Sequence, residues 1–257
     1  MSLARRPLLG ESDPPPSVVH REEGRADVVL LGDHAGNAIP SSLSALGLPA
    51  SDLSRHIAWD LGVRELGEAL SAELDATFIR QSFSRLVIDC NRDPRSAASI
   101  VPSSDGTPVP GNVGLDPDDR EQRRTAIHEP YHQTIAREVQ RRRARGVCPV
   151  IVALHSFTPA LNGAKRPWQI GLLHDAGDTT LTRRLLDRLR REPDLHVGDN
   201  EPYRMDGTDY TIPRHAYPTA ARYVEVEFRQ DLLADREAPR FWAGRFATWL
   251  RDAMALP

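Results

Sequence analysis

A short apolar run that stops at a polar cluster constrains the fold of this chain most. Residues 28–31 (VVLL) have the length and β-branched character that predict a buried strand of a parallel sheet. The run ends at a glycine, and the polar side chains Asp33, His34 and Asn37 follow. In open α/β sheets the loops beyond the carboxyl ends of strands carry the binding sites. We therefore expect a site here; the alternative is a plain turn with one surface histidine.

The rest of the chain alternates between segments with strand patterns and segments with helix patterns. Expected strands cover residues 76–81, 86–90, 149–154, 168–173 and 222–228, and expected amphipathic helices cover 54–74, about 117–145, 179–189 and the stretch around 241–250. This alternation predicts a single α/β domain over residues 26–257, with a mixed, mostly parallel sheet flanked by helices. Residues 1–25 are rich in proline and charge, and we expect them to wrap the surface or to be poorly ordered.

Composition excludes some classes of function. The 257 residues carry a net charge of -3, so no basic surface indicates a nucleic-acid partner. No apolar stretch reaches the length of a membrane span, and the N-terminus lacks the apolar core of a secretory signal, which predicts a cytoplasmic protein. Cys90 and Cys148 each stand in an apolar run, and we expect two buried thiols rather than a disulfide. Nothing in the sequence indicates the oligomeric state.

Two polar segments lack any periodicity. Residues 95–117 are rich in serine, proline, glycine and aspartate, and segments of this length are functional lids or disordered loops. Residues 199–218 are punctuated by glycine and proline and include Tyr203 and Arg214, which we expect to bind substrate as the segment closes over it.

Two histidines indicate a metal site. His34 and His155 each follow a predicted buried strand at its carboxyl end, and imidazole is a common zinc ligand. Zinc would lower the pKa of a bound water to ~7 and would polarise a carbonyl group. Glu225 and Glu227 project to one face of the last predicted strand, and Glu227 suits the role of proton acceptor. The alternatives are isolated structural histidines and an ion-paired strand face.

Arginine and asparagine residues after the expected strand 86–90 indicate a carboxylate-binding pocket. The guanidinium of Arg92 is a planar fork that matches two carboxylate oxygens, and Asn91 adds hydrogen-bonding capacity. Arg85 lies close enough along the chain to reach a developing oxyanion. The alternatives for all three are helix caps and salt bridges at the edge of the sheet.

Five motifs together resemble the N-formylglutamate amidohydrolase family over about residues 27–250. They are 33–40 (DHAGNAIP), 59–62 (WDLG), 84–92 (SRLVIDCNR), 154–157 (LHSF) and 227–231 (EFRQD). The resemblance implies a phosphorylase/hydrolase-like α/β fold, shared with zinc carboxypeptidases, and hydrolysis of N-formyl-L-glutamate to formate and glutamate in histidine degradation.

The resemblance also implies roles for individual residues. His34 and His155 would hold one zinc ion, Asn91 and Arg92 would bind the substrate carboxylate, Arg85 would polarise the scissile carbonyl, and Glu227 would act as general base and then acid.

One position departs from the wider zinc carboxypeptidase pattern. That pattern is His-x-x-Glu, whereas the fourth position here is Asn37, and a neutral amide is a poor zinc ligand. The third ligand is therefore Asn37, water, Asp60 or Asp33. This departure keeps open a non-catalytic carboxylate-binding protein. A related zinc deacylase or carboxypeptidase for another N-acyl amino acid also stays open, because nothing in the sequence selects the acyl group or the amino acid. A serine hydrolase is disfavoured, because the sequence has no Gly-x-Ser-x-Gly motif.

Overall fold

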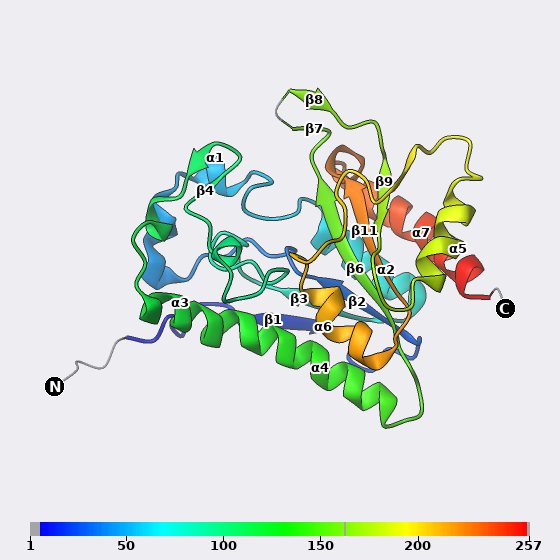
Figure 1. The fold of residues 1–257 in the computed structure, drawn as a ribbon, viewed down its shortest axis with the longest axis horizontal. Helices are drawn as coiled ribbons and strands as arrows, with labels where there is room; N and C mark the ends of the chain where they lie inside the picture. The colour runs from blue at the N-terminus through cyan, green and yellow to red at the C-terminus, as the bar shows by residue number, and fades with distance from the viewer. Residues whose placement is uncertain (1–5, 162, 256–257) are drawn as a thin grey trace.

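A seven-stranded sheet forms the centre of the molecule (Figure 1). The computed structural model of the chain describes residues 6–161 and 163–255. The strands follow one another in the order β1-β3-β2-β6-β11-β9-β10. Their bounds are β1 (Ser17–His20), β2 (Val28–Gly32), β3 (Thr77–Gln81), β6 (Val150–Phe157), β9 (Ile170–Leu173), β10 (Val197–Asp199) and β11 (Tyr223–Arg229).

The sheet is mixed and mostly parallel, as predicted. Strands β3, β2, β6 and β11 all run in the same direction. Strand β1 is antiparallel to β3, and β9 is antiparallel to β11. The carboxyl ends of β2, β6 and β11 therefore open onto the same edge of the sheet, which is where the polar clusters of the sequence lie.

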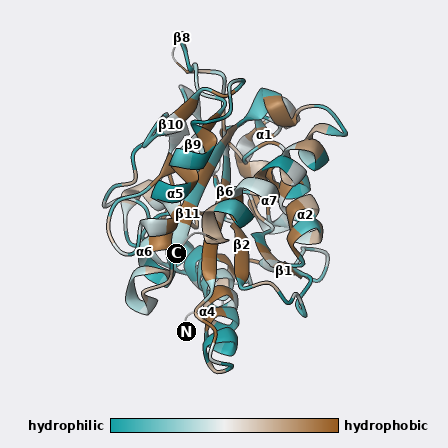
Figure 2. Cartoon of the chain, turned by 90° about the vertical axis from the view of Figure 1, so that its right-hand side faces the viewer, coloured by the Kyte–Doolittle hydropathy of each residue, from teal (hydrophilic) through white to brown (hydrophobic). Residues whose placement is uncertain are grey.

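Helices cover both faces of the sheet. Alternate residues of a strand point to opposite faces, so the five inner strands β3, β2, β6, β11 and β9 contribute to two hydrophobic cores. One core is closed by α2 (Val63–Leu74), α5 (Thr180–Leu189) and α7 (Ala238–Ala255), and the other by α4 (Glu129–Arg143) and α6 (Thr211–His215). In Figure 2 the central strands are largely brown, whereas α4 and α5 also carry teal on their solvent side. This is the predicted α/β fold.

Two predicted elements are wrong. The run 86–90 forms turns rather than a strand, although its residues Leu86, Val87, Ile88 and Cys90 are buried. The predicted helix 54–74 is shorter, because α2 begins only after Gly62, which has a positive φ of 79°. An L-residue rarely adopts that conformation, and a helix cannot continue through it. Residues 54–62 thus form an irregular segment, preceded by the short α1 (Ala50–Leu53).

The predicted helix 117–145 is present but contains a change of winding. It consists of α3 (Pro117–Arg123), a π-helical turn over Arg124–His128 and then α4. A π-turn shifts the faces of the two helical parts relative to each other. It brings His128 to a buried position beside the loop that carries Arg92, whose carbonyl oxygen lies 3.1 Å from His128 Nε2.

The N-terminal segment forms an edge strand that the sequence did not predict. Strand β1 pairs with β3, and Leu8 is buried; the first five residues of the segment 1–25 lie outside the described part. Cys90 is buried as expected, but the prediction for Cys148 was wrong, because this thiol is exposed after α4. Among the described residues, no helix is long and apolar enough to cross a membrane.

Two small hairpins project from the domain. Strands β4 (Ser103–Ser104) and β5 (Thr107–Pro108) form the first, inside the segment 95–117. Strands β7 (Ala160–Leu161) and β8 (Ala164–Lys165) form the second, beyond the end of β6.

Candidate metal centre and active site

A cavity of about 960 Å³ lies at the carboxyl ends of β2, β6 and β11. Nine of the residues that the sequence singled out line it: His34, Asp60, Arg85, Asn91, Arg92, His155, Tyr203, Glu225 and Glu227. The first hairpin borders the same cavity through Asp105 and Gly106, so the segment 95–117 is ordered and forms part of the wall. The volume is ample for a small N-acyl amino acid.

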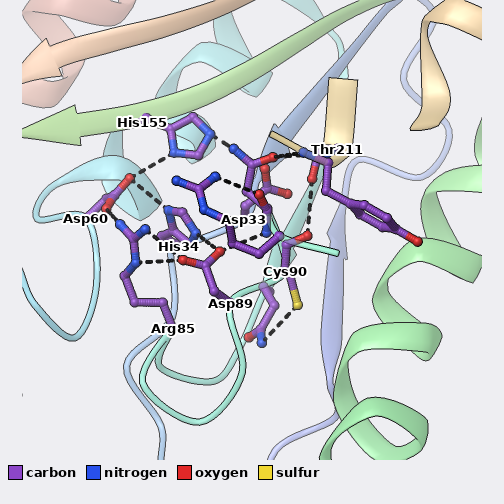
Figure 3. A network of polar contacts seen from close by, with 12 residues as sticks. Asp33, His34, Asp60, Arg85, Asp89, Cys90, His155 and Thr211 are labelled. Atoms are coloured by element: carbon purple, nitrogen blue, oxygen red, sulfur yellow. Dashed lines mark hydrogen bonds and ion pairs between the residues drawn. The ribbon is translucent and has the colours of Figure 1, made fainter. Parts of the chain in front are cut away.

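Three buried side chains in this cavity form a group that could hold a metal ion: His34, Asp60 and His155. His34 follows β2, His155 is on β6, and Asp60 comes from the irregular segment before α2. Oδ2 of Asp60 lies 3.4 Å from Nδ1 of His34 and 3.0 Å from Nδ1 of His155, so both rings turn the same nitrogen to one carboxylate oxygen (Figure 3). The backbone fixes this arrangement, because the N–H of Asp60 donates to the carbonyl of His34 at 2.9 Å.

A carboxylate lies near the far nitrogen of each histidine. Oδ1 of Asp89 is 2.8 Å from Nε2 of His34, and Oδ2 of Asp33 is 3.5 Å from Nε2 of His155. Asp33 is held in turn by Tyr131, whose hydroxyl donates to Oδ1 at 2.7 Å. Metal-binding histidines characteristically have one nitrogen on the metal and the other on a carboxylate.

The donor atoms of this group suit a divalent metal ion. Nδ1 of His34 is buried and has no hydrogen-bond partner among the described residues. Two imidazole nitrogens and a carboxylate oxygen are a ligand set that zinc accepts, with a further position for water. Burial lowers the pKa of His155, but its bonds to Asp33 and Asp60 raise it well above the usual range. Protons and a metal ion would therefore compete for this site.

Asn37, one of the alternatives for the third ligand, does not belong to this group. Its Nδ2 donates to the carbonyl of Leu53, and the side chain does not line the cavity. The adjacent Gly36 packs against the backbone of Ser82, where an added Cβ would lie 2.2 Å from the carbonyl carbon. Asp60, in contrast, contacts both histidines.

Two buried glutamates lie beside the metal-binding group. Glu225 and Glu227 project to the same side of β11, as predicted, and Glu227 is in register with His155 on β6. One carboxylate oxygen of each, Oε2, lacks a hydrogen-bond partner among the described residues. Burial raises the pKa of both carboxyl groups to about 8, against the lowering effect of His155. A carboxyl group in such surroundings is suited to taking up and releasing a proton.

Both predicted arginines line the cavity but are already paired with acids. Nε and Nη2 of Arg85 donate to Oδ2 of Asp89 at 3.1 and 2.7 Å, while Nη1 lies 3.5 Å from Oδ1 of Asp60. Nη1 of Arg92 donates to Oδ1 of Asp209 at 3.1 Å. Burial would raise the pKa of Asp89, but Arg85 and His34 hold it well below the usual range.

Asn91 lines the cavity and also holds a neighbouring segment in place. Its Oδ1 accepts from the backbone N–H groups of Tyr210 at 3.0 Å and Thr211 at 2.9 Å, at the start of α6. Nδ2 lies 3.4 Å from Oδ1 of Asp209. In this structure Asn91 thus anchors the segment 209–211 to the cavity wall.

Comparison with known proteins identifies the family of this chain. The sequence profile of the N-formylglutamate amidohydrolase family matches residues 26–234. The chain belongs to the N-formylglutamate amidohydrolase family. No curated protein sequence matches the chain.

Two solved structures resemble this chain, at different levels of sequence identity. A gene product of Agrobacterium tumefaciens is 35% identical, with a TM-score of 0.93 over 96% of this chain and 98% of that one. An N-formylglutamate amidohydrolase from Ralstonia eutropha JMP134 is 19% identical, with a TM-score of 0.66 over 93% of this chain and 99% of that one. At this lower identity the likeness shows a shared fold.

The two remaining predicted site residues of this family member lie in different places. Tyr203 lines the cavity, and its hydroxyl accepts a hydrogen bond from Arg166 at 3.0 Å. Arg214 does not line it; the guanidinium stacks on Tyr210 and borders a separate cavity of about 400 Å³.

Sequence reasoning did not single out Asp89 or Arg166. The position of Asp89 in the motif 84–92 is a signal that could have identified it. Arg166 follows the second hairpin, where the sequence has no periodicity and gave no signal.

Proposed function

We propose that the protein is a zinc-dependent amidohydrolase that cleaves N-formyl-L-glutamate to formate and glutamate, a reaction of histidine degradation. Family membership supports an amide-hydrolysing enzyme. The observation that carries the proposal is the group His34, Asp60 and His155, buried next to Glu227 in one cavity.

His34, Asp60 and His155 would hold the zinc ion. When bound, the ion would supply Lewis acidity to the scissile carbonyl and lower the pKa of a water molecule. Asp89 and Asp33 orient the two imidazole rings and keep their Nδ1 atoms directed at the site.

Glu227 is the proposed general base and acid. Its carboxylate takes a proton from the attacking water and then delivers it to the amide nitrogen, so that glutamate leaves as a neutral amine. Register with His155 places the side chain beside the metal-binding group. Glu225 lies closer to His155, with Oε1 4.0 Å from Nε2, and we assign it an electrostatic role toward that ring.

Arg85 and Arg92 are proposed to bind two different groups of the substrate, the scissile carbonyl and the α-carboxylate. Nη1 of Arg85 points toward the metal-binding group, which supports a contact with the scissile carbonyl. Arg92 would bind the α-carboxylate of the substrate, which would replace Asp209 as the hydrogen-bond partner of Arg92. Asn91 supports Arg92 by holding the segment that carries Asp209.

Release of the free amino acid from a panel of substrates tests the proposal. The panel contains N-formyl, N-acetyl and N-succinyl derivatives of glutamate, aspartate and methionine. We expect the highest kcat/KM on N-formyl-L-glutamate. Turnover of another acyl group only would make the protein a different deacylase, and binding of these compounds without turnover would make it a carboxylate-binding protein.

A further inference from the structure

Arg166 occupies an unusual position for an arginine. It is only 9% exposed, and its guanidinium contacts two aromatic rings, 4.8 Å from the ring centroid of Tyr203 and 5.8 Å from that of Phe157. Nη1 lies 3.0 Å from the Tyr203 hydroxyl and 3.5 Å from Oγ1 of Thr158. Tyr203, Phe157 and Thr158 all line the cavity of the candidate active site; Arg166 does not line it itself but contacts all three of these residues.

The other buried arginines of residues 6–161 and 163–255 have stronger partners. Arg142 pairs with Glu138 at 2.6 Å. Arg123 donates to two backbone carbonyls and to the side chain of Asn112. Arg166 pairs with no carboxylate in the described part of the chain. A buried charge without a counter-ion is costly, and contacts with aromatic faces offset only part of that cost.

The remaining candidate cations near the site are less suited to bind a second carboxylate. Arg229 pairs with Asp231 and donates to backbone carbonyls. Arg214 borders the other cavity. Arg204 lines the active-site cavity but is exposed, so fixing its long side chain on a ligand would cost conformational entropy. Arg166 is already fixed by its packing.

The position of Arg166 also suits the length of a substrate side chain. Phe157 is two residues beyond His155 on the same face of β6, which places it about 7 Å farther along the strand. The γ-carboxyl carbon of an extended N-formylglutamate lies roughly 6 Å from the formyl carbon, given standard bond lengths. The distance from His155 to Phe157 thus matches the reach of the side-chain carboxylate of a substrate whose amide lies at His155.

We propose that Arg166 and Tyr203 bind the side-chain carboxylate of an N-acylated dicarboxylic amino acid and so determine the preference for acidic substrates. The guanidinium donates to the carboxylate, and the Tyr203 hydroxyl accepts from Arg166 while donating its own proton to the same carboxylate. This inference rests on the proposed function, with Arg92 on the α-carboxylate and Arg166 on the second one.

A pair of isosteric substrates isolates this contact. N-formyl-L-glutamine has the same size and α-carboxylate as N-formyl-L-glutamate but a neutral side chain. We expect wild-type kcat/KM to be higher for the glutamate compound by about 30-fold or more, because a desolvated cation would lose its partner. Arg166→Gln should reduce this ratio to a few-fold by lowering kcat/KM on the glutamate compound. Tyr203→Phe should lower kcat/KM on the glutamate compound roughly tenfold.

Two controls separate this contact from others. Arg204→Gln, an exposed arginine of the same cavity, should retain the glutamate preference. Arg92→Gln should lower kcat/KM on both compounds by a similar factor, because both carry the α-carboxylate. If Arg166→Gln does not fold, Arg166→Lys replaces it, and we expect an intermediate ratio because lysine keeps the charge without the fork.

The outcomes distinguish this inference from the proposed function. A wild type that hydrolyses both compounds with equal kcat/KM, or an Arg166→Gln variant that loses activity equally on both, would overturn the role of Arg166 and leave the amidohydrolase intact. A wild type that hydrolyses neither would overturn the proposed function itself.

Discussion

Oδ1 of Asp89 lies 2.8 Å from Nε2 of His34, on the side of the ring away from Asp60. This contact leaves Nδ1 of His34 directed at the place where Asp60 and His155 converge. Asp89 also holds Arg85 through its second oxygen. One buried carboxylate thus fixes both a proposed metal ligand and a proposed substrate-binding residue.

Asp89→Asn should therefore weaken zinc binding without removing a ligand. Loss of a carboxylate behind a metal-binding histidine typically costs about 10–100-fold in affinity. Competition with a fluorescent chelator measures this change. Asp93→Asn serves as the control, because Asp93 pairs with Arg95 outside the metal-binding group. Equal zinc affinity of wild type and Asp89→Asn would show that this contact does not orient a ligand.

Asp60 and Asn37 can be distinguished by metal content. Asp60→Asn keeps the size of the side chain but removes the charged oxygen between the histidines, so we expect protein that binds little zinc. Asn37→Ala loses a hydrogen bond to the Leu53 carbonyl and should keep its metal. Elemental analysis of both purified variants measures the stoichiometry. The opposite pattern would identify Asn37 as the ligand.

Glu227 and Glu225 should differ in their effect on the rate. Glu227→Gln keeps the shape of the side chain and removes its ability to carry a proton, so kcat should fall by about 10²–10⁴ while zinc stays bound. Glu225→Gln should have a much smaller effect. Steady-state kinetics together with zinc content makes the comparison. Equal losses would mean that the two carboxylates act as a unit, and a larger loss for Glu225→Gln would assign the base to that residue.

A further prediction concerns the pH dependence of stability, which we expect to depend on two histidines outside the active-site cavity. His132 and His215 are buried and joined at 2.9 Å, and burial lowers the pKa of His215 from 6.5 to about 4. Between these two pH values the unfolded chain binds a proton that the folded protein excludes. The free energy of unfolding should therefore fall as the pH falls through this window, by about 1.4 kcal/mol per pH unit for each such histidine.

Denaturant unfolding of metal-free protein at several pH values from 7 to 4 tests this. His215→Gln keeps a donor for His132 and removes one titrating group, so its stability should fall less steeply than that of the wild type. Parallel curves for the two proteins would contradict the role of His215.

The parts of the site that lie on strands were predictable from the sequence. His34, His155 and the two glutamates follow from apolar runs and strand alternation, because both patterns are imposed by burial against a sheet. The run 86–90 shows the limit of that signal. It is as apolar as a strand and is buried, but its residues pack beneath the cavity without a strand partner.

The parts that depend on contacts between distant segments were not predictable. Asp60 was one of the candidates for the third ligand, but the sequence could not select it, because it lies in a stretch whose spacing resembles a helix and only the left-handed Gly62 separates it from α2. Asn37 fits a ligand pattern by spacing, but its Nδ2 donates to the carbonyl of Leu53 and its side chain does not line the cavity. Arg166 contacts Tyr203 only in the folded structure, because Tyr203 lies 37 residues later in the chain.

The central claim is that a zinc ion held by His34, Asp60 and His155 is required for hydrolysis of N-formyl-L-glutamate. The most direct test is to remove metal with a chelator, exchange the chelator away, and titrate zinc back while measuring formate release. The account predicts an inactive metal-free protein whose activity rises linearly and saturates at about one zinc ion per chain. Full hydrolysis of N-formyl-L-glutamate by protein shown to contain no metal would contradict it.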